Sequence, residues 1–106
     1  MVHHISLLET RTNLTAEMIE KLMVELRIRL LKVSDVNNLK VGKRIDGSDN
    51  NFQLFYAFDV ENMDKLRLFK ESAVYAQFTR QILDPYVIRS WQMNFEMEPG
   101  KDTRYS

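Results

Sequence analysis

The stretch FQLFYAFDV, residues 52–60, is apolar on both faces if it forms a strand. Successive side chains of a strand point to opposite faces of the sheet. One face would carry Phe52, Leu54, Tyr56, Phe58 and Val60. The other would carry Gln53, Phe55, Ala57 and Asp59, so it also holds an aromatic ring and an alanine. A strand with one face in water shows a cleaner alternation than this. We therefore expect both faces of this strand to be covered.

The composition is that of an ordinary globular domain. The chain has 106 residues, enough for one domain that buries roughly two thirds of its unfolded surface. Lysine plus arginine equals aspartate plus glutamate at 15 each, whereas nucleic-acid binders usually carry a basic excess. The absence of cysteine excludes disulfides, thiolate nucleophiles and cysteine zinc sites. We expect no nucleic-acid partner, no metal and no cofactor.

The sequence also lacks the signals of membrane insertion and secretion. No apolar run approaches the roughly 18 residues of a membrane helix. The N-terminus shows no basic segment followed by an apolar run, which a secretory signal requires. We expect a cytoplasmic protein with no membrane partner.

The hydrophobic pattern predicts four strands and three helices. The first helix follows the N-cap Thr15, and its apolar side chains recur at spacings of three and four, typical of one buried face. These side chains are Ile19, Leu22, Met23, Leu26 and Leu30. Asn62 and Ser72 can cap two shorter helices, and Asp84-Pro85 ends the second because the residue before proline avoids the helical region. The expected strands are 2–9, 39–45, 52–60 and 87–97, and the expected helices run from Thr15 to near Lys32, over 63–69 and over 73–83.

The order of these elements predicts an α+β fold, with one domain at residues 1–99 and a polar tail at 100–106. The order β-α-β-β-α-α-β is that of the ferredoxin-like split βαβ arrangement with a four-stranded antiparallel sheet. Right-handed crossovers place the helices on one side of this sheet. No element of the chain is then left to cover the other side. A second copy of the sheet is the economical cover, so we expect a homodimer whose sheets share a core about 10 Å thick.

Four segments resemble the stress-responsive A/B-barrel family, also called Dabb. They are VHHISLL at the start, SAVYAQF and LDP after a short helix, and WQMNFEMEP at the end. The resemblance covers residues 1–99 and implies a dimeric α/β barrel, in which two four-stranded sheets close around an interior cleft. The family includes plant stress proteins and olivetolic acid cyclase, as well as members without known activity.

The resemblance implies candidate site residues. In the cyclase-like pattern a histidine of the first strand faces the cleft, and His4 matches it. Tyr75 stands where that pattern has its second histidine, and Phe69 stands where it has a tyrosine. His4 and Tyr75 are therefore the candidate catalytic residues, and Tyr56, Phe69 and Trp91 are candidates for lining a ligand site.

Two functions of different classes remain open. One is a stress-related or ligand-binding homodimer without catalysis, whose barrel interior is closed by side chains or holds a small apolar molecule. The other is a cofactor-free cyclase or lyase for a polyketide-like or aromatic substrate, with His4 as base and Tyr75 as proton partner or oxyanion donor; a cofactor-free monooxygenase is a third reading. We favour the first because catalysis usually needs a set of groups and the sequence offers one. A cavity that reaches both His4 and Tyr75 would favour the enzyme.

Overall fold

The computed structural model describes residues 1–47 and 50–102, and the order of its elements agrees with the expected one. The strands are β1 (Val2–Thr10), β2 (Asn37–Lys43), β3 (Leu54–Val60) and β4 (Val87–Glu96). The helices are α1 (Ala16–Leu31), α2 (Met63–Lys70) and α3 (Ala73–Phe78), and α3 continues into a π-helical turn at Thr79–Leu83.

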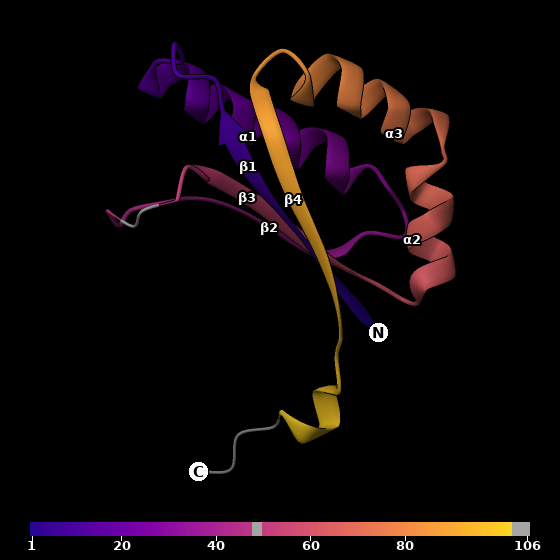
Figure 1. Cartoon of the computed structure of the whole chain (residues 1–106). Coiled ribbons are helices and arrows are strands. Elements are labelled where there is room, and N and C mark those ends of the chain that lie inside the picture. Colours follow the sequence, from indigo (N-terminus) through magenta and orange to yellow (C-terminus); the bar gives the residue numbers. More distant parts are fainter. Residues whose placement is uncertain (48–49, 103–106) are drawn as a thin grey trace.

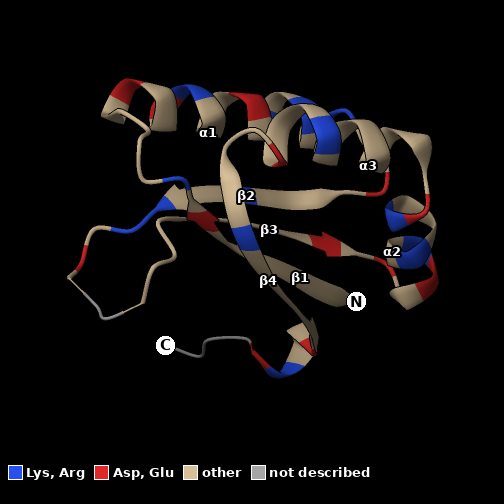
Figure 2. Cartoon of the chain, turned by 45° about the horizontal axis from the view of Figure 1, so that its top comes forward, with Lys and Arg blue, Asp and Glu red and all other residues tan. Residues whose placement is uncertain are grey.

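Within the described residues, the strands form a four-stranded sheet in the order β2-β3-β1-β4, with every neighbouring pair antiparallel. The first strand of the chain thus lies inside the sheet, between β3 and β4. The helices pack on one side of the sheet, and the other side has no helix over it (Figures 1 and 2). This is the ferredoxin-like α+β fold that the sequence predicted.

The predicted N-caps are confirmed. The hydroxyl of Thr15 accepts a hydrogen bond from the amide of Met18 at 3.2 Å. Asn62 caps α2 through the amide of Lys65 at 2.9 Å, and Ser72 caps α3 in the same way. Each side chain satisfies an amide that would otherwise lack a partner in the first turn, so these residues set where the helices begin.

The core lies between the helices and one face of the sheet. β1 turns every second side chain into it, so that Val2, His4, Ser6, Leu8 and Thr10 are buried while the residues between them are half-buried. The predicted face of β3 is buried against α1 and α2, through Leu54, Tyr56, Phe58 and Val60. The helical stripe is also confirmed, with Leu22, Met23, Leu26 and Leu30 buried and Ile19 packed beside them.

The structure corrects the boundaries near the β2–β3 loop. β3 begins at Leu54 rather than at residue 52, and β2 ends at Lys43. The amide of Arg44 still donates to the carbonyl of Gln53 at 2.8 Å, but the chain then leaves the sheet. Ile45, which the alternation placed in a strand, is 95% exposed. Of the expected turn at 46–51, residues 48–49 lie outside the described residues.

Two further boundaries differ from expectation. The predicted helix 73–83 is α-helical only to Phe78, because the widened turn follows it before Asp84. The expected polar tail contains a short 3-10 turn at Pro99–Lys101, and residues 103–106 lie outside the described part of the chain. No described helix is long and apolar enough to span a membrane.

Phe58 lies at the centre of the core and is fully buried. We expect Phe58→Ala to lower the free energy of unfolding by about 3–5 kcal/mol, because the lost ring leaves a cavity that neighbours fill only in part. Leu31→Ala is the control, since this α1 side chain is 67% exposed, and its effect should stay within about 0.5 kcal/mol. Urea denaturation measures both. A similar loss in the two variants would contradict the placement of the core.

Candidate functional site

His4 lies on the inner face of the sheet, under the helices. Its Nδ1 donates to Oδ1 of Asn94 on β4 at 2.7 Å, since an amide oxygen can only accept. Its ring packs against that of Phe58, with centroids 5.1 Å apart. Burial lowers the pKa of His4, and the nearby Lys70 and His3 add to this, while the bond to Asn94 opposes it. His4 is therefore neutral near pH 7, with a lone pair on Nε2.

Tyr75 projects from α3 toward the same inner layer. Its ring meets that of Phe69 edge to face at 5.2 Å, and its hydroxyl accepts a bond from Nε2 of Gln92 at 3.4 Å. The ammonium of Lys70 donates to the other end of the Gln92 amide. Burial lowers the pKa of Lys70, because its charged form has lost part of its water.

Tyr56 lies next to both His4 and Tyr75. It is buried on β3, with its ring tilted against that of His4 at a centroid distance of 6.2 Å. Burial raises the pKa of Tyr56, and the neighbouring Tyr75 raises it further while Ser6 acts against both. His4, Tyr56, Phe69 and Tyr75 thus lie in one inner cluster. Asn94, Gln92 and Lys70 belong to it as well and were not predicted.

The cavities beside this cluster are small and do not join its two catalytic candidates. A cavity of about 150 Å³ is lined by Tyr75, Thr79 and Gln92 but does not include His4. A second cavity, of about 260 Å³, lies between the end of α1 and the short helices. Phe69 and Phe78 form its floor, with Arg29 and Lys32 among its lining residues. The rings of Phe58 and Tyr56 pack beside the buried His4.

Trp91 lies on the other face of the sheet. It pairs with Leu7 across β1 and β4, and Leu7 alternates with the buried Ser6 and Leu8. Trp91 is 62% exposed. The candidate residues are therefore divided between two layers, and Trp91 does not share a site with His4.

This other face, which we call the open face, is largely apolar along its middle. Its apolar side chains are Ile5 and Leu7 on β1, Phe55 and Ala57 on β3, and Trp91, Met93 and Phe95 on β4. Gly42 on β2 completes it, because an added Cβ would stand 2.6 Å from the Phe55 ring. Phe55 therefore rests directly on the backbone of β2.

At one end of the open face, three residues form a polar network that the sequence reading missed. Nδ1 of His3 donates to the Asp59 carboxylate at 2.6 Å, and the side-chain amide of Asn38 donates to its other oxygen at 2.9 Å. Asn38 has a left-handed backbone, with φ of 53°, where the β2–β3 register shifts. Burial alone would raise the pKa of Asp59, but Asn38 and His3, with Lys40 nearby, outweigh it and lower the pKa.

The sequence signal that could have revealed this network is the alternation of side chains between the two faces of each strand. Asp59 was expected on the second face of its strand, and His3 lies on the face opposite to His4 because adjacent side chains of a strand alternate. Their pairing follows only from the register, which sets His3 opposite Asp59. Asp59 consequently cannot serve His4, whose partner is Asn94. The described residues contain no group of three or more His, Cys, Asp or Glu side chains that could hold a metal ion.

Comparisons with solved structures show the same fold in proteins of remote sequence. A DABB family protein with a ferredoxin-like fold from Mesorhizobium loti has a TM-score of 0.79 and 9% identity, over 92% of this chain and 96% of that one. A dimeric ferredoxin-like protein of unknown function from Thermobifida fusca gives 0.75 and 16%, over 91% and 90%. The hydroxynitrile lyase of Passiflora edulis gives 0.78 and 14%, over 98% and 96%.

No protein-family model and no curated protein matches the chain. The fold that the family resemblance implied is thus confirmed by structure. At these identities the comparisons establish the fold and leave the activity open.

The buried His4 predicts a specific dependence of stability on pH. Its pKa in the folded state lies below the value of about 6.5 in the unfolded chain, so the unfolded state binds the proton first. Stability should therefore fall as the pH drops through about 6.5 toward the lowered pKa. We expect His4→Gln, which keeps an amide donor for Asn94, to lose this decline. Urea denaturation between about pH 8 and pH 5 measures it.

His3→Gln is the matched control, because it removes the neighbouring histidine from the open face and should leave the His4-dependent decline in place. If both variants keep the decline, His4 is not its source.

Proposed function

We propose that the protein acts as a homodimer in which two open faces pack together, and that this dimer binds a small apolar ligand without catalysis. The observation that carries the proposal is the apolar open face. Its middle is formed by side chains from three strands, and Trp91 and Phe95 are largely exposed on it. Exposed apolar patches of this kind mark interaction surfaces. A second copy offers the same pleated surface and the same apolar pattern, which a two-fold interface requires.

The charges around the open face support the same arrangement. His3 pairs with Asp59 at one end of the face, and Arg89 lies 3.8 Å from Glu9 at the other, while Lys40 lies at its edge, on β2 opposite Ala57. Covering charges that already have partners costs less than covering isolated ones. A centre of apolar side chains with polar groups around it is the usual composition of a protein interface. Figure 2 shows that lysine, arginine and the acidic residues are otherwise gathered mainly on the helices and loops.

The comparisons support the dimer by analogy. The Thermobifida fusca protein, described as dimeric, shares this fold over most of both chains. The absence of cysteine fits a reducing compartment, and the proposal places the dimer in the cytoplasm.

A cofactor-free lyase or cyclase is the second candidate. The inner cluster favours it, because a neutral His4 can accept a proton and Tyr75 can donate one. The hydroxynitrile lyase of similar fold favours it as well. Against it stands the arrangement of the cavities, since the one beside Tyr75 does not include His4. The ligand-binding dimer is therefore preferred, because it explains the apolar open face and the enzyme does not.

If the two open faces form the dimer interface, one charged side chain introduced into the open face should separate the subunits. We expect Met93→Glu to convert a dimer of twice 12.6 kDa into a monomer, because a buried carboxylate without a partner is costly. Met18→Glu is the control, since Met18 lies on α1 and both methionines are 37% exposed. Light scattering over a dilution series measures the mass, and circular dichroism checks that both variants fold.

Two results would contradict the proposed dimer. One is a stable, folded wild-type monomer at all concentrations. The other is a dimer that survives Met93→Glu but is lost in Met18→Glu, which would place the interface on the helices.

The enzyme alternative has its own test. With racemic mandelonitrile, an aromatic hydroxynitrile, we expect no release of benzaldehyde above the rate in buffer, because the cavity beside Tyr75 does not include His4. Absorbance of benzaldehyde follows the reaction. Turnover that disappears in both His4→Gln and Tyr75→Phe would favour the lyase over the binding protein.

A further inference from the structure

The open face contains a hollow of about 500 Å³ where β2 ends and β3 begins. We call it the β2–β3 hollow, and its main lining residues are Leu7, Phe52, Phe55, Trp91, Lys43 and Arg44. Its volume lies within the range of roughly 300–1,000 Å³ that is usual for small-molecule sites. It is separated by the sheet from the inner cluster that contains His4, so it is a different site from the one that the family resemblance implied.

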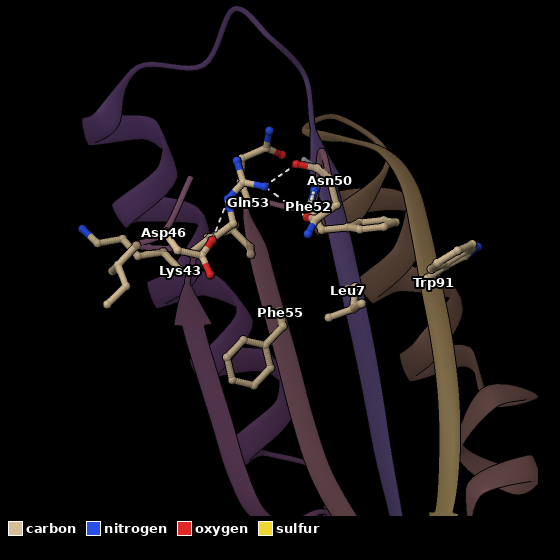
Figure 3. A pocket seen from close by; sticks show the side chains of 11 residues that line it. Leu7, Lys43, Asp46, Asn50, Phe52, Gln53, Phe55 and Trp91 are labelled. Carbon is tan, nitrogen blue, oxygen red and sulfur yellow. Dashed lines mark hydrogen bonds and ion pairs between the residues drawn. The ribbon is translucent and has the colours of Figure 1, made fainter. Parts of the chain in front are cut away.

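The floor and one wall of the hollow suit a flat apolar group. The rings of Phe52 and Trp91 are stacked, with centroids 5.5 Å apart and an angle of 28° between their planes. Leu7 and Phe55 lie beside them on neighbouring strands, on the same side of the sheet (Figure 3). Aromatic side chains offer large apolar contact areas and favour stacked or edge-on contact with another ring.

The opposite wall is cationic. Arg44 follows Lys43, the last residue of β2, and both residues line the hollow. Lys43 is paired with the buried Leu54, so its side chain points to the helix side of the sheet. Lys43 forms an ion pair with Glu20 of α1, but both side chains are more than half exposed, so this pair is weak and open to exchange. Asp46 is the acidic residue of the lining, and Arg44 Nε lies 3.9 Å from its carboxylate. Arg44 is therefore the cationic side chain that can face a ligand in the hollow.

The rim is held in place before any ligand arrives. The amide of Gln53 donates to the carbonyl of Leu8 at 3.0 Å, and its side-chain oxygen accepts from the amide of Thr10 at 3.0 Å. Asn50 accepts hydrogen bonds from Arg44 and from the amide of Phe52. These bonds join the loop to the ends of β1 and β2, and a preorganised site loses less entropy on binding.

We propose that the β2–β3 hollow binds a small organic carboxylate with a flat apolar body. The body lies on Phe52 and Trp91, and the carboxylate faces Arg44. The inference rests on the proposed function in one respect, since a second copy packed on the open face closes the side of the hollow that faces away from the sheet. The hollow lies at the end of the face, and a ligand enters there.

A matched pair of probes tests the charge requirement. The probes are 4-phenylbutyrate and its neutral amide, 4-phenylbutyramide, which share the same apolar body. Trp91 is the single tryptophan of the chain, so its emission reports binding at this hollow without a label. Excitation at the red edge of indole absorption avoids the probe, and calorimetry gives the affinity. We expect the acid to shift the emission with saturation and to bind about ten-fold more tightly than the amide.

Variants locate the site. We expect Arg44→Met to weaken binding of the acid about ten-fold while binding of the amide changes by less than about two-fold. Phe52→Ala should weaken both probes, because it removes apolar contact. Arg29→Met is the matched control, since Arg29 belongs to the smaller helix-side cavity, which also has an aromatic floor.

Three outcomes would overturn the inference: no saturable change at millimolar probe, equal affinity for acid and amide, or a loss in Arg29→Met with none in Arg44→Met. Light scattering on the same samples tests the proposed dimer independently of the ligand site. A dimer that binds neither probe overturns the hollow as a site, because the partner's side chains then fill it. A monomer that binds the acid as expected overturns the dimer and keeps the site.

Discussion

The packing of a twisted sheet that is apolar on both faces is the constraint on which this structure depends. The helices cover one face, and their apolar stripes bury the alternate residues of β1 and β3. The same alternation pushes Ile5, Leu7, Phe55 and Ala57 to the other side. Because the strand period is two, no shift of one residue would improve the second face without spoiling the first. The open face, its hollow and the separation of the two candidate sites all follow from this pleat.

The two adjacent histidines show how strongly the two faces differ. His4 has an amide partner and aromatic neighbours, and its lowered pKa keeps it neutral. His3, one residue earlier, has a carboxylate partner and stands at the edge of an apolar surface. A charged imidazole is thus disfavoured on one face and has a matching anion on the other. Sequence adjacency says little about chemical role when the strand separates the environments.

Much of the fold could be predicted because its determinants are local. Thr15, Asn62 and Ser72 cap helices through bonds to residues three positions on, and the stripe of α1 depends on spacing alone. The start of β3 could not be predicted from Phe52 and Gln53, whose side chains suit a strand. Gln53 bonds to Leu8 and Thr10, far away in sequence, and to Arg44, whereas the amide of Phe52 donates to the nearby Asn50.

The residues of the candidate site also fall into those that the sequence could predict and those that it could not. His4, Phe69 and Tyr75 were assigned to one region by resemblance and Tyr56 as an aromatic residue of a strand, and the structure brings the four together. Trp91 was added as an aromatic residue of a strand, and only the register with Leu7 shows that it faces the other way. Asn94 and Asp59 gave no local signal, because each acquires its role from a histidine on a paired strand.

The order of the sheet also has a consequence for how the chain folds during synthesis. β1 is made first, yet its partners are β3 and β4, and the β1–β4 pair joins Val2 to Glu96. β1 therefore emerges with both edges unpaired. One edge can pair once β3 has been made, but the other stays unpaired until β4 has been made. Such long-range pairing slows folding, because the loop must close before its contacts form. Until then the nascent chain exposes the apolar residues of both faces, which makes this interval the one in which a chaperone would have most to protect.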